Sequence, residues 1–251
     1  MAGVEGRVAL ITGGGRGIGR ATADILASRD ARVMCVARSE DDLAKTGHEY
    51  ALADLGTPEG CAKAIADTED RLGPIDILIC NHGLGSAHEK VIWEQDLKDW
   101  SDSIRINLDG PFYLSRLVLK GMVERRYGRV VFTSSTAALN AEHGASAYNS
   151  SKAGLLGLMR SVAEDGGAYD ITSNAVLPGW VRTEMAERSA RYEAKDRGIT
   201  AGEVWEERAA LYRPGRVATP EEVGEMIAFL ASEESSGVSG ESIRVALGST
   251  W

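Results

Sequence analysis

Residues 8–26 read VALITGGGRGIGRATADIL, and this stretch decides the fold class. An apolar, β-branched run leads into a glycine-rich turn, and an apolar pattern of helical period follows the turn. The turn contains Gly13, Gly14, Gly15, Gly17 and Gly19. A strand that enters a helix through such a turn presents free backbone N–H groups, which can bind a phosphate. The GxxxGxG spacing differs from the GxGxxG dinucleotide fingerprint, so a merely flexible turn stays open as the alternative, although so many glycines exceed what helix entry needs.

The same alternation of apolar strand and helix continues along the chain. Strands are predicted at residues 7–12, 32–37, 75–80, 129–133 and 171–177. Helices are predicted at residues 17–28, 58–72, 100–125, 147–163 and 220–231. Strands that are apolar on both faces form a parallel sheet covered by helices on both sides. Since no Pro/Gly-rich linker interrupts the alternation, we predict an α/β fold with one doubly wound, Rossmann-like domain over residues 1–251.

Composition and charge exclude several classes of protein. The 37 acidic residues exceed the 28 basic ones, which gives a net charge of −9 and argues against a nucleic-acid or anionic-membrane partner. No secretory signal precedes the first strand and no apolar run is long enough for a membrane span, so we expect a cytoplasmic protein. The cysteines Cys35, Cys61 and Cys80 form no CxxC pair, which predicts reduced thiols in the core and no metal site.

Tyr148 and Lys152 stand four residues apart in a predicted helix. This spacing places both side chains on one helix face, where the ammonium can lie close to the phenol. A nearby cation favours the phenolate, so it is expected to lower the pKa of Tyr148 from its ordinary value of about 10. A YxxxK match is frequent by chance, and a surface Tyr/Lys pair is the alternative unless other motifs accompany it.

Five further motifs accompany this pair. They are TGGGRGIG at residues 12–19, CNHG at residues 80–83, Asn107 in INLDGPF, Ser135 thirteen residues before Tyr148, and PGWVRT at residues 178–183. In this order and spacing, and over residues 6–248, the chain resembles the short-chain dehydrogenase/reductase family. The resemblance implies an enzyme that transfers hydride between a nicotinamide cofactor and a carbonyl/secondary alcohol pair.

The resemblance also implies roles for four residues. Tyr148 is expected to act as general acid in reduction and as base in oxidation. Lys152 is expected to bind the nicotinamide ribose and to lower the pKa of Tyr148. Ser135 is expected to donate a hydrogen bond to the substrate oxygen, with two serines that merely cap a strand as the alternative for Ser134 and Ser135. Asn107 is expected to help hold a water that links the lysine to solvent.

Two arginines point to the cofactor. Ala37 stands where NAD-selecting relatives carry an aspartate, and Arg38 follows it. With no carboxylate expected there, Arg38 and Arg16 can meet a 2′-phosphate, so we predict NADP(H) over NAD(H), with ordinary surface arginines as the alternative.

The resemblance assigns the remaining cofactor contacts as well. They are Gly13, Gly15, Gly17, Ile18, Gly19, Asp54, Leu55, Asn81, Gly83, Pro178, Gly179, Val181 and Thr183, together with Tyr148 and Lys152. Two departures from the family pattern stand out. His82 replaces a small residue, and RVALGSTW closes the chain where many relatives read VDGG.

Residues 180–212 are the expected substrate lid. Candidate substrate contacts are His143, Trp180, Met185 and Tyr192. The lid also contains the acid-first pairs Glu184/Arg188, Glu187/Arg191 and Glu193/Arg197, which are typical of a solvated helix face, with capture of an anionic substrate as the alternative. Because no basic patch converges on the lid, we predict a neutral or weakly polar ketone as substrate.

Other functions stay open at this point. Within the same class they are a 3-oxoacyl-thioester reductase and an NAD-dependent polyol or hydroxy-acid dehydrogenase, and outside it a non-catalytic nucleotide-sensing regulator.

Residues 100–125 and 147–163 are apolar on more than one face, and Gly154 and Gly157 allow close helix approach. In the family these helices pack across a two-fold axis, so we expect a homo-oligomer, a tetramer or a dimer, with burial against the sheet as the alternative.

Overall fold

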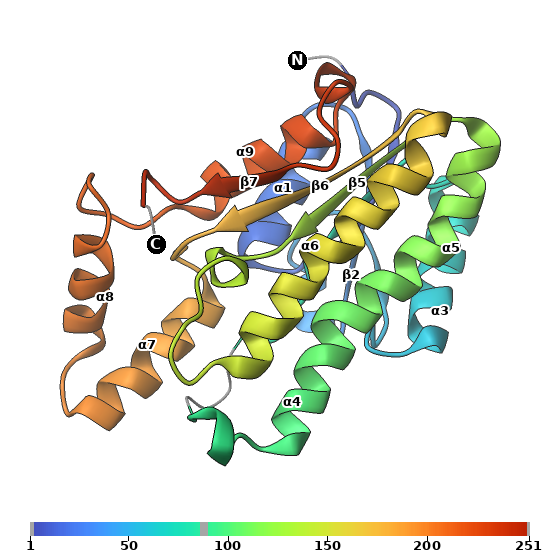
Figure 1. Ribbon diagram of the computed structural model, residues 1–251. Helices are drawn as coiled ribbons and strands as arrows, with labels where there is room; N and C mark the ends of the chain where they lie inside the picture. Colours follow the sequence, from blue (N-terminus) through green and yellow to red (C-terminus); the bar gives the residue numbers. More distant parts are fainter. Residues whose placement is uncertain (1–2, 86–89, 250–251) are drawn as a thin grey trace.

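A computed structural model describes residues 3–85 and 90–249. Seven parallel strands form one sheet in the order β3-β2-β1-β4-β5-β6-β7 (Figure 1). The strands are β1 Val8–Thr12, β2 Arg32–Ala37, β3 Glu49–Leu52, β4 Ile77–Cys80, β5 Gly128–Thr133, β6 Ile171–Pro178 and β7 Ser242–Val245. The order reverses direction between β1 and β4, which is the topological switch point where doubly wound proteins bind ligands. The predicted α/β fold class is confirmed.

Helices cover both faces of this sheet (Figure 1). They are α1 Gly17–Ala27, α2 Glu40–Leu43, α3 Pro58–Leu72, α4 Leu97–Ile104, α5 Gly110–Arg125, α6 Ser146–Gly166, α7 Glu184–Arg197, α8 Ala201–Ala210 and α9 Pro220–Leu230. One core cluster lies between the sheet and α3, α5 and α6, and a second lies between the sheet and α1 and α9. Cys35, Cys61 and Cys80 are buried in these cores as free thiols, as predicted.

Two details of the sequence prediction need correction. The helix predicted at residues 100–125 begins earlier, at Leu97, and a π-helical turn, Arg105–Asp109, interrupts it. The edge strands β3 and β7 were not among the predicted runs, because each has four residues and mixes polar with apolar side chains. In RVALGSTW the first two residues end β7, and residues 250–251 lie outside the described chain.

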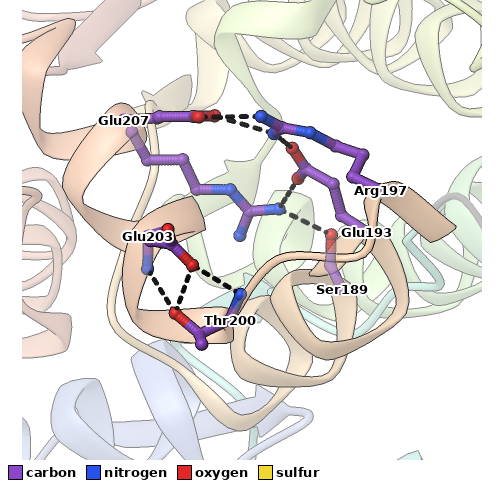
Figure 2. Close-up of polar contacts among 7 residues, drawn as sticks. Ser189, Glu193, Arg197, Thr200, Glu203 and Glu207 are labelled. Carbon is purple, nitrogen blue, oxygen red and sulfur yellow. Dashed lines mark hydrogen bonds and ion pairs between the residues drawn. The ribbon is translucent and has the colours of Figure 1, made fainter. Parts of the chain in front are cut away.

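Helices α7 and α8 form a pair with a small core of their own, built from Ala186, Ala190, Ala194, Val204 and Trp205. Only the third predicted i, i+4 ion pair appears among the described contacts: Arg197 bonds Glu193 at 2.6 Å, while Glu187 pairs with Arg182. Figure 2 shows Arg197 between Glu193 and Glu207, so its contacts join the two helices. The predicted solvated face therefore doubles as a helix-to-helix contact.

Candidate active site

The four predicted catalytic residues come together at the carboxyl ends of β4 and β5. Ser135 follows β5, Tyr148 and Lys152 lie in the first two turns of α6, and Asn107 lies in the π-helical turn. Adjacent parallel strands end at one edge of the sheet, which explains how residues 45 positions apart in the sequence, Asn107 and Lys152, reach one site.

The Tyr148 phenol forms a hydrogen bond with the Ser135 hydroxyl, and this bond favours the phenolate. Burial acts in the opposite direction and outweighs it, raising the pKa of Tyr148 to about 12. In the protein chain by itself the predicted lowering by Lys152 does not set the net direction of this pKa shift, and it stays a prediction for the enzyme with its cofactor bound. The reason is geometric, because the Lys152 Nζ atom lies 5.8 Å from the centre of the Tyr148 ring and is bonded elsewhere.

Lys152 is 5% exposed, and its ammonium donates a hydrogen bond to the Thr133 carbonyl at 2.9 Å. Burial lowers the pKa of Lys152 to about 8, because the described partner is a neutral carbonyl that compensates desolvation only in part. The lysine can therefore lose its proton within the working range of an enzyme.

Asn107 is fully buried and clamps the loop after β4. Its carboxamide accepts a hydrogen bond from Leu84 N at 2.7 Å and donates to Leu84 O at 2.9 Å and to Ser151 Oγ at 3.0 Å. These bonds explain how an asparagine is stable inside a helix. They also fix the loop that carries Gly83, where a Cβ would lie 3.1 Å from Asn107 Oδ1 and 3.4 Å from Lys152 Nζ.

The structure distinguishes the two serines after β5. Ser134 donates to the Lys152 carbonyl at 2.9 Å and so holds α6 against the strand. Ser135 faces Tyr148, and its oxygen also accepts a hydrogen bond from Ala137 N at 3.1 Å. The thirteen-residue interval thus selects the serine that contacts the phenol.

The glycine turn fits the phosphates of a dinucleotide. Gly13 and Gly17 have φ values of +66° and +53°, which residues with a side chain rarely adopt. Arg16 precedes α1 with extended backbone and no side-chain cap, so the first N–H groups of α1 are available to an anion. A Cβ at Gly19 would lie 2.5 Å from Asn81 Nδ2, so only glycine lets the turn and the β4 loop meet.

The arginine pair has an acidic neighbour that the sequence did not predict. Arg38 is exposed after β2, and Arg16 lies 3.7 Å from the Asp42 carboxylate. The short helix α2, capped by Ser39, folds Asp42 back against Gly15. The end of β2 itself carries Ala37 and no carboxylate, as the sequence analysis noted, but chain folding rather than sequence adjacency brings Asp42 to Arg16.

Two further predicted cofactor regions lie at the same edge of the sheet. Asn81 donates its side-chain amide to Thr12 O at 3.1 Å, which ties the end of β4 to the end of β1. Leu55 is buried, while the exposed Asp54 lies 3.7 Å from Arg105 and accepts a hydrogen bond from Gly56 N.

Residues 178–183, here called the strap, leave β6 and pass the glycine turn. Thr183 caps α7 by accepting a hydrogen bond from Ala186 N, and a Cβ at Gly17 would lie 3.2 Å from Thr183 Cγ2. Val181 packs into the core between the sheet and α1, and Ile18 lies at the same cluster.

The first residues of the strap contact Tyr212. Gly179 lies beside the hydroxyl of Tyr212, which accepts a hydrogen bond from Trp180 N at 2.6 Å. Pro178 ends β6.

The four predicted substrate contacts lie in different surroundings. Met185 lies near Gly85, beside the loop after β4, with its Sδ atom 3.3 Å from where a Cβ of Gly85 would be. His143 and Tyr192 are exposed, Tyr192 with 64% of its surface. Trp180 is partly buried: its ring packs against the small core of the α7–α8 pair and stacks on Arg208. Its contact with substrate stays a prediction.

Comparisons with known proteins cover nearly the whole chain. A family profile described as enoyl-(acyl carrier protein) reductase matches residues 13–250. The 3-oxoacyl-(acyl-carrier-protein) reductase FabG of Vibrio cholerae is 33% identical over 96% of both chains. The acetoacetyl-CoA reductase of Shinella zoogloeoides is 34% identical over 94% of this chain and 95% of its own. The chain belongs to the short-chain dehydrogenase/reductase family.

Solved structures of similar proteins agree with this family. Levodione reductase superposes with a TM-score of 0.92 at 30% identity over 97% of both chains. A variant of actinorhodin polyketide ketoreductase with NADPH superposes with a TM-score of 0.90 at 30% identity over the full length of both. Within the part of the chain that the structure describes, no helix is long and apolar enough to cross a membrane and no group of three potential metal ligands occurs.

His82, the departure from the usual short-chain dehydrogenase/reductase pattern, is accommodated by a glycine. Its Nδ1 atom lies 2.8 Å from Thr12 Oγ1, and its Nε2 atom lies 2.8 Å from where a Cβ of Gly110 would be. Burial, together with the nearby Lys152 charge, lowers the pKa of His82 to about 3. The imidazole is therefore a neutral packing group that joins β1 to the start of α5, as the sequence suggested for a non-catalytic histidine.

Sequence reasoning missed Thr133 O, Tyr212 and Arg208. A backbone carbonyl has no sequence signature. Tyr212 and Arg208 contact strap residues from 28 or more positions away, and only the family pattern PGWVRT marks the segment that they touch.

Proposed function

We propose that this chain uses NADPH to reduce a ketone to a secondary alcohol, with Tyr148 as the proton donor. The observation that carries the proposal is the Tyr148 phenol, which meets the Ser135 hydroxyl beside the buried ammonium of Lys152. The relatives, which include reductases of keto groups and a ketoreductase solved with NADPH, support the same reaction class.

Each residue of the site has a separate role in this reaction. When bound, NADPH supplies the hydride that adds to the carbonyl carbon. Tyr148 donates its proton to the carbonyl oxygen as negative charge develops there, and Ser135 donates a hydrogen bond to the same oxygen. Lys152 is protonated below its pKa of about 8 and then stabilises the phenolate that Tyr148 becomes. Asn107 holds the loop after β4 so that Gly83 stays against Lys152.

The pKa of Tyr148 decides which form of the phenol is present. At about 12 it keeps the phenol protonated at neutral pH, which a proton donor requires. In oxidation the same phenol would have to act as a base, and it would lose its proton only at higher pH.

We further infer that the glycine turn, the β4 loop and the strap hold NADP(H). Arg38 and Arg16 would bind the 2′-phosphate in competition with Asp42, which lies 3.7 Å from Arg16. Asp54 and Leu55 would contact the adenine, and Thr183 would bind the nicotinamide carboxamide. We infer one functional unit over residues 1–251, with residues 180–212 as its substrate lid.

The substrate we propose is a neutral or weakly polar ketone. Support comes from Met185 beside the loop after β4 and from the acidic balance of the chain. A 3-oxoacyl thioester is the second candidate, and it is favoured by the names of the relatives from Vibrio cholerae and Shinella zoogloeoides.

A panel of substrates tests the function. NADPH and NADH would each be offered with a cyclic diketone, a β-keto ester and acetoacetyl-CoA, and the oxidised cofactors NADP and NAD with a polyol and a hydroxy acid. Oxidation or formation of the reduced cofactor would be followed. We expect faster turnover of the uncharged ketones with NADPH. Preference for acetoacetyl-CoA would select the second candidate, and preference for a polyol or hydroxy acid with NAD would contradict the proposal. Cofactor binding without any turnover would indicate a nucleotide-sensing regulator.

We also propose a cytoplasmic homo-oligomer, a tetramer or a dimer, assembled through the outer faces of α5 and α6. Phe112 on α5 is 46% exposed, and a Cβ at Gly157 on α6 would have open space around it. The three buried free thiols support a reducing compartment. Light scattering of the purified protein tests the assembly, and a monomeric mass would contradict it.

A further inference from the structure

We propose that Arg208 is a positioning residue for the nicotinamide end of the cofactor site, which it holds in place through the strap. The inference rests on the proposed function, because it concerns the binding of NADPH. It concerns a residue of α8, on the opposite side of the strap from Gly17.

The strap presents alternate side chains to two different parts of the protein. Val181 packs toward the core between the sheet and α1, and Thr183 lies against Gly17. Trp180 and Arg182 point the other way and contact residues of α8. This alternation is the period of two of an extended chain, and the isolated bridge between Val181 and Ala218 confirms the extended backbone.

Four side chains form a continuous stack on the α8 side of the strap. The Arg208 guanidinium lies 3.6 Å from the centre of the Trp180 ring and 5.1 Å from that of Trp205. The Arg182 guanidinium lies 4.3 Å from the centre of the same Trp205 ring. The two α8 residues therefore lie between the two strap residues in this stack. Cation–π attraction is strong here because Arg208 and Trp205 are each only 5% exposed.

Arg208 is itself fixed by the first turns of α7. Its guanidinium donates to Ala186 O at 3.2 Å, to Ser189 Oγ at 3.0 Å and to Glu193 at 2.8 Å. All three groups lie within the helix that Thr183 caps. Arg208 therefore holds both ends of the connection between Trp180 and α7, and Thr183 lies inside that connection.

This arrangement fixes Thr183 relative to the glycine turn. If the stack is lost, Trp180 and the first turn of α7 can shift, and Thr183 moves with them because its hydroxyl is the N-cap. The half of the cofactor that meets the strap should then bind less well, whereas the adenosine half, held from Arg38 and Arg16, should not change. A residue needed only for folding would not separate the two halves.

Arg197 offers a matched control in the same network. Figure 2 shows Arg197 bridging Glu193 and Glu207. It bonds the same Glu193 as Arg208 but is not among the stacked residues. Its contacts also leave Glu193 paired when Arg208 is replaced, so the Arg208→Met variant does not strand a carboxylate without a partner.

The experiment titrates full-length protein with NADPH and, separately, with adenosine 2′,5′-bisphosphate, which lacks the nicotinamide. The variants are Arg208→Lys, Arg208→Met and Arg197→Gln. We expect both Arg208 variants to weaken NADPH binding about tenfold, as lost desolvated cation–π and charged hydrogen bonds imply. Their affinity for the bisphosphate should stay at the wild-type value, and Arg197→Gln should change neither affinity. Arg208→Lys keeps the positive charge, so the inference can still be tested with this variant if Arg208→Met does not fold.

Three outcomes would overturn the inference. One is wild-type NADPH affinity in both Arg208 variants, and another is equal weakening of both ligands, which would indicate general damage. The third is an effect of Arg197→Gln as large as that of Arg208→Lys, which would assign the role to helix pairing in general. If wild-type protein bound no NADPH, the proposed function would fail instead, so the two failures are distinguishable.

Discussion

The catalytic helix α6 and the α7–α8 pair place buried cations in opposite ways. Lys152 donates to a neutral carbonyl, and burial brings its pKa down to about 8. Arg208 donates to the Glu193 carboxylate and stacks on two tryptophan rings. A buried cation held by a neutral group can change its charge near neutral pH, whereas a paired guanidinium stays charged. The first arrangement suits proton chemistry, and the second suits a fixed structure.

Of all the substitutions considered, loss of the proposed proton donor beside Lys152 should have the largest effect on activity. We expect Tyr148→Phe to lower kcat by about 10³-fold or more, because the phenol is the proposed general acid. Tyr169→Phe, just beyond the far end of α6, is the control and should leave kcat unchanged. NADPH-dependent ketone reduction measures both variants. Wild-type turnover by Tyr148→Phe would refute the acid/base role.

Replacing Lys152 tests whether catalysis needs a buried cation that can lose its proton near neutral pH. We expect Lys152→Met to lower kcat/KM by about 10²-fold through loss of phenolate stabilisation. In wild type, kcat/KM for ketone reduction should fall as the pH rises through about 8, where Lys152 loses its proton, and this limb should be absent in the variant. A pH profile with the same limb in both proteins would assign it to another group.

The same lysine gives a linked prediction for stability. Its pKa is lowered from 10.5 in the unfolded chain to about 8 in the folded one, so between these values the unfolded chain binds more protons. The contribution of Lys152 to the free energy of unfolding should therefore rise with pH through this window. Denaturant titrations of wild type and Lys152→Met at several pH values measure this contribution: the free energy of unfolding of wild type minus that of the variant should rise between about pH 8 and pH 10.5.

The next prediction concerns Arg38, an exposed cation that differs from both buried cations, Lys152 and Arg208. It tests whether Arg38 sets the choice between NADPH and NADH. Arg38→Asp should lower the ratio of kcat/KM for NADPH to that for NADH by about 10- to 100-fold, because a charged contact to the 2′-phosphate becomes repulsion. Arg32→Asp at the opposite end of β2 changes the net charge equally and should leave the ratio as it is. An equal response of the two variants would mean that overall charge, not Arg38, sets the preference.

The smallest effect is expected for the outer ion pairs of the α7–α8 pair. Arg197 contacts Glu193 and Glu207 at the surface, where solvent screens such pairs. We expect Arg197→Gln to lower Tm by no more than about 3 °C and to leave kcat/KM unchanged. Thermal unfolding measures this, and a shift comparable to that of Arg208→Met would mean that the outer network, not the stack, holds the pair.

The sequence predicted those parts of the site that depend on local spacing. Tyr148 and Lys152 share a helix face because of helix periodicity, and Ser135 was separated from Ser134 by its interval to Tyr148. It did not predict Asp42 beside Arg16 or the sign of the Tyr148 pKa shift, because both depend on what packs around these groups.

By itself, the sequence determined the doubly wound sheet, the glycine turn and the motifs that identify the family, because these follow from apolar periodicity and from backbone conformations that favour glycine. Tertiary structure decided the rest. The stack of Arg208 on Trp180, the fit of His82 against Gly110 and the carbonyl that holds Lys152 join elements far apart in the chain. No local pattern encodes such contacts, because their free energy depends on burial and geometry that exist only once the elements have packed.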